Sequence, residues 1–227
     1  MFKIGIQLFT AEGPHAVEKL ASLGAGIFLD LKFHDIPSSA AGALRAAAGL
    51  SGIRLINVHA LGGFEMMRAA AQVIAAQPNR PKLLAVTLLT SLNRAALAQM
   101  GIAGLPARRA VKLAKLAQQA GLDGVVASAH EARAIRRNCG KKFLIVVPGV
   151  RPARRGQPAA KSDQARVATP TEAIHAGADY LVVGRPITAA RDPLTAAAAI
   201  VEEIARALQN PASEEAGYSL THPGTLH

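Results

Sequence analysis

The amino-acid sequence predicts a single (β/α) barrel, and two observations support this fold class. Short apolar runs rich in Ile, Leu and Val alternate with Ala- and Leu-rich stretches of helical periodicity, which indicates a parallel sheet covered by helices. The alternation continues through residues 1–209 without a break that would mark a domain boundary, and such repetition is typical of a barrel. An open, doubly wound sheet is the alternative architecture.

The apolar runs predict seven parallel strands. They lie at residues 3–8, 26–32, 53–59, 83–89, 124–128, 143–147 and 180–184. Because the standard barrel of this type has eight strands, the sequence predicts a (β/α)8 TIM-type barrel without its first βα unit, a piece on the order of 30 residues. Such a barrel is expected to have a gap, with exposed backbone groups along both flanking edges.

The stretches between the strands predict the helices that cover the sheet. They span residues 14–23, 38–50, 64–76, 106–120 and 129–138, and a final helix spans 192–208. Asp192 followed by Pro193 is a typical cap and first turn for this last helix. Residues 210–227 are polar, rich in Gly, Pro, Ser and Thr, and without periodicity, which predicts a flexible C-terminal tail.

The chain is strongly basic, with 26 Lys and Arg against 15 Asp and Glu and a net charge of +11. The cations gather at residues 108–115, 133–142 and 151–155, but no stacking aromatic side chains are interleaved with them, as in single-strand binders. We therefore interpret them as a solvated surface and expect no specific nucleic-acid partner, although a weak nucleic-acid binder stays an alternative.

Other composition signals concern the cell compartment. No stretch is long and apolar enough to span a bilayer, and the start MFKIGIQLF lacks the layout of a signal peptide. Cys139 is the single cysteine, so a disulfide within the chain is impossible. The sequence thus predicts a cytoplasmic protein with no membrane partner.

A charged run, FLDLKFHDIP, ends the second predicted strand. Alternation along residues 26–32 puts Asp30 and Lys32 on one face, pointing into the barrel at the end where barrel enzymes keep their active sites. Asp35 follows in the next loop, and Lys3 in the first strand adds a second cation. The structural alternative is an ion pair between Asp30 and Lys32, with Asp35 as a helix N-cap. The whole run at a strand end favours function.

The run DLKFHDIP closely resembles the signature of the orotidine 5′-phosphate decarboxylase family. The resemblance extends from residue 3 to about residue 208, and its further segments occur in the family's order and spacing. These segments are FKIGIQLFTAEGP, INVHALGG, VTLLTS, GLDGVVAS, VPGVRP, DQARVATP and LVVGRPIT. The resemblance implies a TIM-type barrel, a homodimer with shared active sites, and conversion of orotidine 5′-phosphate to UMP and CO2 in de novo pyrimidine biosynthesis, without a metal or organic cofactor.

The resemblance also implies roles for the charged residues. Lys32 would donate a proton to C6 of the pyrimidine as CO2 leaves, and Asp30 would lie beside the substrate carboxylate. Asp35 would reach across the dimer interface into the partner's site, while Lys3 would contact the ribose and hold Asp30. A fixed ammonium group suits this reaction because carbanion character develops at C6.

The remaining residues that the resemblance implies would bind substrate. They are Ile36, Ser39, Thr90, Pro148, Arg151, Gln164, Gly184 and Arg185. Thr90 would contact the pyrimidine, Gln164 would lie near the phosphate, and Ser39 stands where the family usually has Thr. Gly184 and Arg185 also have an independent argument, because barrels often bind phosphate after their last strands. The segment 151–169 would be a phosphate-gripping lid, or equally a surface loop.

Three other functional hypotheses remain. A related phosphosugar decarboxylase or aldolase shares the Asp-x-Lys-x-x-Asp pattern but typically requires a divalent metal. A truncated, inactive or weakly active homologue would lack the aspartate that the family's first unit supplies to the ribose. A nucleic-acid binder is the third. We assign no chemistry to His34 and His59, which are more often structural histidines.

Overall fold

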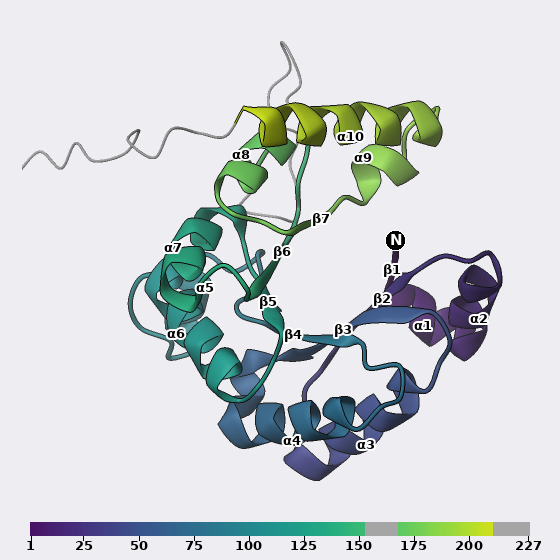
Figure 1. Ribbon diagram of the computed structural model, residues 1–227. Helices are drawn as coiled ribbons and strands as arrows, with labels where there is room; N and C mark the ends of the chain where they lie inside the picture. Colours follow the sequence, from purple (N-terminus) through teal and green to yellow (C-terminus); the bar gives the residue numbers. More distant parts are fainter. Residues whose placement is uncertain (153–167, 211–227) are drawn as a thin grey trace, which may run out of the picture.

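Seven parallel strands curve around a common centre in the computed structural model, which describes residues 1–152 and 168–210 (Figure 1). The strands are β1 (Phe2–Gly5), β2 (Ile27–Phe33), β3 (Ile53–His59), β4 (Lys82–Val86), β5 (Gly124–Val126), β6 (Leu144–Pro148) and β7 (Tyr180–Val182). Each strand pairs with the next one in chain order. This order confirms the predicted barrel and excludes the doubly wound sheet, whose strand order reverses.

Helices alternate with the strands, and most of them cover the outside of the sheet. They are α1 (Ile6–Glu12), α2 (Pro14–Ser22), α3 (Pro37–Ala48), the 3-10 helix η1 (Ala60–Gly62), α4 (Gly63–Ala75), α5 (Arg94–Gln99), α6 (Pro106–Gln119), α7 (Ala129–Cys139), α8 (Pro170–His175), α9 (Arg185–Thr188) and α10 (Pro193–Gln209). Asp192 caps α10 as predicted, because its side chain accepts from the backbone N–H groups of Leu194 and Thr195. No helix among residues 1–152 and 168–210 combines the length and apolarity needed to cross a membrane.

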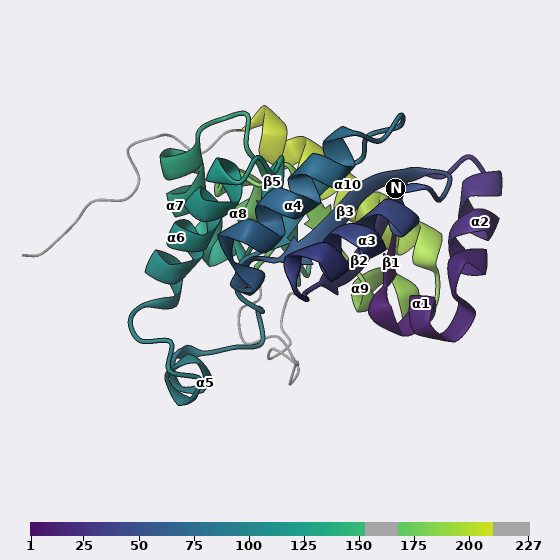
Figure 2. The same ribbon diagram turned by 90° about the horizontal axis from the view of Figure 1, so that it is seen from below.

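Several local predictions need correction. The first strand ends at Gly5, and residues 6–8, expected as strand, begin α1. Alternating apolar residues in a short run fit either structure, and here Thr10 Oγ1 donates to the Ile6 carbonyl, 2.7 Å away, within the helix. The short helices α1, α5, α8 and α9 were not predicted; α5 lies apart from the barrel wall (Figure 2). The predicted tail lies outside the described residues from 211 onward.

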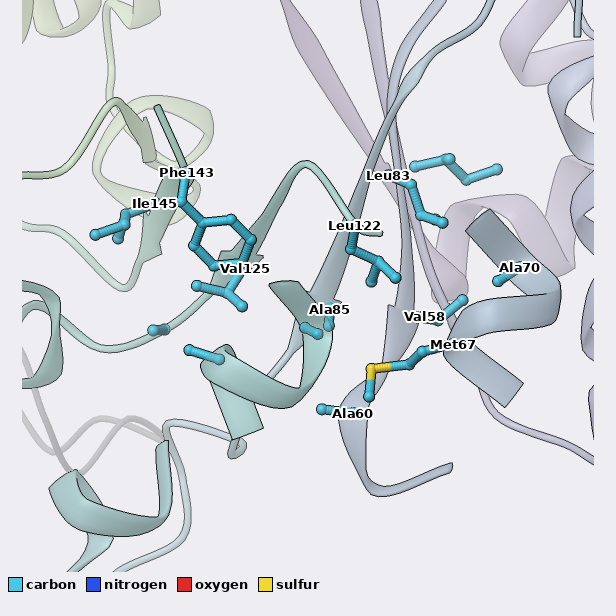
Figure 3. Packing of buried hydrophobic residues seen from close by; sticks show 14 of the residues in the cluster. Val58, Ala60, Met67, Ala70, Leu83, Ala85, Leu122, Val125, Phe143 and Ile145 are labelled. Carbon is cyan, nitrogen blue, oxygen red and sulfur yellow. The ribbon is translucent and has the colours of Figure 1, made fainter. Parts of the chain in front are cut away.

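Side chains of the strands alternate between two apolar layers. In β4, Leu84 and Val86 belong to the cluster inside the barrel, while Leu83 and Ala85 face the helices. The outer layer is the larger one, and Figure 3 shows part of it, including Leu83 and Ala85 of β4 and Met67 of α4. Both faces of the sheet are therefore buried, which explains the almost continuous apolar runs in the sequence.

Aspartates tie neighbouring strands together at the end of the barrel opposite the charged run. Asp123, just before β5, accepts from the backbone N–H of Leu83 in β4 at 2.9 Å. Asp179, just before β7, accepts from the N–H of Ile145 in β6 at 2.7 Å and pairs with Arg136 at 2.6 Å. These contacts fix strand register at a face that in barrels serves stability.

The barrel is open between its first and last strands. Within the described residues, β1 pairs only with β2 and β7 only with β6 (Figure 1). Helix α10 exposes Leu194, Val201 and Leu208, which recur every seven residues and so lie on one side of the helix. The fold matches the prediction of a TIM-type barrel lacking one unit, and the exposed apolar side of α10 is a surface that a further helix could cover.

We predict that Gly124→Ala destabilises the barrel. A Cβ at residue 124 would overlap the backbone carbonyl of Leu144, so β5 and β6 would have to separate. Overpacking of this kind costs about 2–3 kcal/mol. Gly42→Ala in α3 is the control, because its Cβ meets nothing and Ala in a helix gains about 0.5–1 kcal/mol over Gly. Urea unfolding measures both; equal effects would contradict the close approach.

Candidate active site

A cavity of about 390 Å³ lies at the C-terminal ends of the strands. This volume is within the range of small-molecule sites. Its floor consists of apolar side chains from the barrel interior, such as Phe28, Val126 and Val182. The predicted site residues that line it are Lys3, Asp30, Lys32, Thr90, Pro148, Arg151, Gly184 and Arg185. The cavity therefore brings together residues from both ends of the sequence.

The charges around the cavity favour an anionic ligand. Lys3, Lys32, Arg151 and Arg185 are cationic, and Asp30 is the one carboxylate among the described lining residues. The two arginines follow β6 and β7, the last strands of the sheet, where barrels often bind phosphate. The combined positive field attracts and orients a negatively charged small molecule.

Asp30 is the centre of an ionic array. Its Oδ1 lies 2.7 Å from Lys32 Nζ, and its Oδ2 lies 3.2 Å from Lys3 Nζ. The Asp30 side chain is only 12% exposed, whereas the lysines are about one-third exposed. Gly5 leaves room for the Lys3 ammonium, because a Cβ there would lie 3.0 Å from Lys3 Nζ. Strands β1 and β2 thus hold one carboxylate between two cations.

The surroundings of Asp30 keep it ionised. Burial alone would raise the pKa of this carboxyl. The charge of Lys32 and hydrogen bonds from Lys32 and Asn57, together with the charge of Lys3, outweigh burial and hold the pKa of Asp30 below its usual value. The array is therefore a fixed anion between two ammonium groups rather than a neutral acid.

A β-bulge shapes the strand that carries Asp30 and Lys32. Leu29 pairs with Ile56 and Phe33 with Val58, so β2 has more residues than β3 between these two points. Lys32 adopts φ +53°, a left-handed conformation that is unusual for a residue other than glycine. Bulges are common beside active sites because they redirect side chains.

Sequence reasoning missed Asn57, which contacts both Asp30 and Lys32. Its Nδ2 donates to Asp30 Oδ1 at 2.6 Å, and its Oδ1 accepts from the Lys32 backbone N–H at 2.8 Å. A signal was present: Asn57 is a polar residue between the apolar Ile56 and Val58 in the middle of a strand that is buried there. Only the strand pairing reveals which groups it faces.

Other predicted site residues lie outside the cavity. Asp35, Ile36 and Ser39 are exposed, in the loop after β2 and the first turn of α3. Asp35 accepts a hydrogen bond from the Ile36 N–H at 2.6 Å, but the N-cap of α3 is Ile36, so the N-cap interpretation of Asp35 is wrong. Gln164 and residues 153–167, the larger part of the segment predicted as a lid or a surface loop, lie outside the described residues.

Two histidines, one directly after β2 and one at the end of β3, stack on each other. The rings of His34 and His59 are stacked, with centroids 5.4 Å apart and an interplanar angle of 17°. His59 is buried, and its Nδ1 accepts from the Leu61 N–H at 3.3 Å. Burial, followed by the charges of His34 and Lys32, lowers the pKa of His59 to about 4. His59 is therefore neutral at physiological pH.

Fold and site together define an α/β-barrel enzyme with a cationic ligand cavity above the strand ends. No group of three or more His, Cys, Asp or Glu side chains arranged to hold a metal ion occurs in the described part of the chain.

Comparison with known proteins identifies the family. Residues 1–200 match the family model described as orotidine 5′-phosphate decarboxylase / HUMPS family, and the chain belongs to this family. The chain is 55% identical over 202 residues to an orotidine 5′-phosphate decarboxylase of Nitrosococcus oceani, covering 89% of this chain and 85% of the relative. A relative of the same name from Halorhodospira halophila is 55% identical over 205 residues, covering 90% of this chain and 85% of that protein.

A solved structure supports the same assignment. The crystal structure of orotidine 5′-phosphate decarboxylase from Lactobacillus acidophilus matches with a TM-score of 0.76 and 40% identity, covering 89% of this chain and 85% of that one. The family prediction made from DLKFHDIP is thus confirmed.

We predict that His59 makes the protein less stable as the pH falls from about 6.5 to 4. In this window the unfolded histidine, with an ordinary pKa near 6.5, binds a proton that the folded one does not. The free energy of unfolding then falls by up to about 1.4 kcal/mol per pH unit. His59→Asn keeps an acceptor near the Leu61 N–H but cannot titrate, so its urea unfolding should lose this slope.

The exposed His130 provides the control for that experiment. His130→Asn should keep the wild-type slope, and a His59→Asn protein with an unchanged slope would contradict the assignment of the pH dependence to His59.

Proposed function

We propose that the protein is an orotidine 5′-phosphate decarboxylase that converts orotidine 5′-phosphate to UMP and CO2 in de novo pyrimidine biosynthesis. The observation that carries the proposal is the pair of Lys32 and Asp30, 2.7 Å apart in a cationic cavity. The names of the similar proteins support it. We expect a cytoplasmic location, as the single cysteine suggests.

In the proposed reaction the bond between C6 of the pyrimidine and the carboxyl carbon breaks. CO2 leaves, and the electron pair remains at C6, where the nearby Lys32 ammonium stabilises the developing negative charge. Lys32 then transfers a proton to C6 and regains one from water. Asp30 orients Lys32 through their ion pair, and its negative charge disfavours a substrate carboxylate placed beside it. Lys3 keeps Asp30 ionised and contacts the ribose.

The rest of the substrate would occupy the other side of the cavity. Arg151, Gly184 and Arg185 would bind the phosphate, since a guanidinium offers paired donors to phosphate oxygens and glycine lets the ligand approach the backbone. Thr90 would contact the pyrimidine near Pro148. Gln164, which lies outside the described residues, would complete the phosphate site.

We also propose a homodimer in which each subunit completes the other's site. Asp35, Ile36 and Ser39 are exposed at the rim of the cavity-bearing end, and Ile36 is 64% exposed despite being apolar. The exposure of these side chains leaves them accessible to a second subunit, as the family resemblance of the run DLKFHDIP implies for Asp35. Asp35 would then join the lysines of the partner's array, balancing its second cation.

The opening between β1 and β7 favours a second candidate, a weakly active or inactive homologue. Lys3 comes from β1, a strand that pairs on one side only within the described residues. A phosphosugar-acting enzyme is a further alternative, because such enzymes share the Asp-x-Lys-x-x-Asp pattern of residues 30–35. The similar proteins named orotidine 5′-phosphate decarboxylase argue against it.

We predict that the protein decarboxylates orotidine 5′-phosphate in a UV assay and that Lys32→Ala lowers kcat at least about 1,000-fold, since the proton donor and its electrostatic stabilisation are both lost. Lys112→Ala, at an exposed position of α6, should keep the wild-type rate. Activity should persist with a chelator present. Absence of turnover of orotidine 5′-phosphate would support the phosphosugar-type alternative, and loss of turnover on chelation would contradict a metal-free reaction. An unchanged rate in Lys32→Ala would overturn the mechanism.

A second prediction concerns the shared site. Lys32→Ala and Asp35→Ala are each expected to be inactive, but mixing and re-associating them should restore activity. If Asp35 serves the partner, half of the dimers are mixed and each has one intact site, so about one quarter of the wild-type activity returns. If Asp35 serves its own subunit, both mutations leave every site defective and no activity returns.

A further inference from the structure

We infer that Asn57 is a positioning residue that holds Lys32 and Asp30 in the geometry needed for proton transfer, an inference that rests on the proposed function. One buried amide of β3 contacts both residues of the array, although it does not line the cavity itself.

The contacts of Asn57 are directed toward two different chemical groups. Its Nδ2 donates to Asp30 Oδ1 at 2.6 Å, and the same oxygen accepts from Lys32 Nζ at 2.7 Å. Its Oδ1 accepts from the backbone N–H of Lys32 at 2.8 Å. Asn57 is 0% exposed, so water cannot replace either bond. Both ends of the amide are therefore occupied, and its orientation is fixed.

The bulge in β2 explains why this backbone contact matters. The shift in register between Leu29 and Phe33 takes the Lys32 N–H out of the regular ladder with β3. A buried N–H without a partner is unfavourable, and Asn57 Oδ1 supplies the partner from the neighbouring strand. Among the described residues, Lys32 is the one non-glycine residue with positive φ. Such a backbone persists only when its surroundings stabilise it.

The left-handed backbone determines where the Lys32 ammonium can reach. If residue 32 relaxed to an extended conformation, its side chain would leave the direction that brings Nζ to Asp30. A misplacement on the order of 1 Å can reduce a rate about 100-fold. Asn57 also donates to Asp30 without adding a charge, so it supports the ionised carboxylate and leaves the balance of the array unchanged.

Asparagine can accept from the Lys32 N–H and donate to the Asp30 carboxylate without adding a charge. Aspartate at residue 57 could still accept from the Lys32 N–H, but its second oxygen would face Asp30 and repel it. Leucine has a similar volume and makes neither bond. The two substitutions thus separate loss of the bonds from introduction of a charge.

The experiment compares Asn57→Leu and Asn57→Asp with Thr87→Val, a control that removes another buried hydrogen bond, from Thr87 Oγ1 to the Val126 carbonyl. Steady-state kinetics on orotidine 5′-phosphate should show kcat about 100-fold lower in Asn57→Leu, with KM within about threefold. Thr87→Val should keep the wild-type kcat, even if its free energy of unfolding falls as much as that of Asn57→Leu. For Asn57→Asp, the acid limb of kcat against pH should move to higher pH, because two adjacent carboxyls share a proton.

A measurement independent of activity separates this inference from the proposed function. Carbon-13 NMR titration of the Asp30 carboxyl should give a higher pKa in Asn57→Leu than in wild type, and hydrogen exchange of the Lys32 amide should be faster. If wild type does not decarboxylate orotidine 5′-phosphate, the proposed function fails while these two changes still test the contacts. An unchanged Asp30 titration, or a loss of kcat no larger than in Thr87→Val, would overturn the positioning role.

Discussion

The buried carboxylate of Asp30 is the constraint on which the site depends. A carboxylate with this little exposure is tolerated only if donors replace the water that it has lost. Three groups do so: the ammoniums of Lys32 and Lys3 and the amide of Asn57. They come from β1, β2 and β3, so the charge is stabilised only when these strands pair in the observed register. Folding of this part of the barrel and assembly of the site are thus one event.

The charged residues at one end of the barrel stabilise the pairing of the strands, whereas those at the other end line the cavity. At one end, Asp123 and Asp179 bind backbone N–H groups of neighbouring strands, where paired arginines and lysines neutralise them. At the other end, four cationic side chains and one carboxylate are among the described residues that line the cavity. Such a lining attracts a negatively charged ligand. One end of the barrel thus stabilises strand register, whereas the other is suited to bind an anion.

The sequence was sufficient to predict the number of strands and the position of the charged run, because both depend on local patterns. Alternation in β2 correctly put Asp30 and Lys32 on one face, with Leu29 on the other. It did not reveal the bulge, which exists only as a mismatch in length between β2 and β3. Asn57 was missed for the same reason: its partners lie 25 and 27 residues away in the chain. The boundary of β1 was misjudged because a short apolar run does not distinguish strand from helix.

The opening of the barrel affects Lys3 more than it affects Asp30 and Lys32. Asp30 and Lys32 belong to a strand that pairs on both sides, and Asn57 connects them to β3. Lys3 belongs to β1, whose Phe2 is 59% exposed and whose second edge has no partner in the described residues. Strand ends with few neighbours are the first to open locally. Loosening of β1 would weaken the contact between Lys3 and Asp30 before it disturbed the proton donor, so an open barrel should impair substrate affinity more than the chemical step.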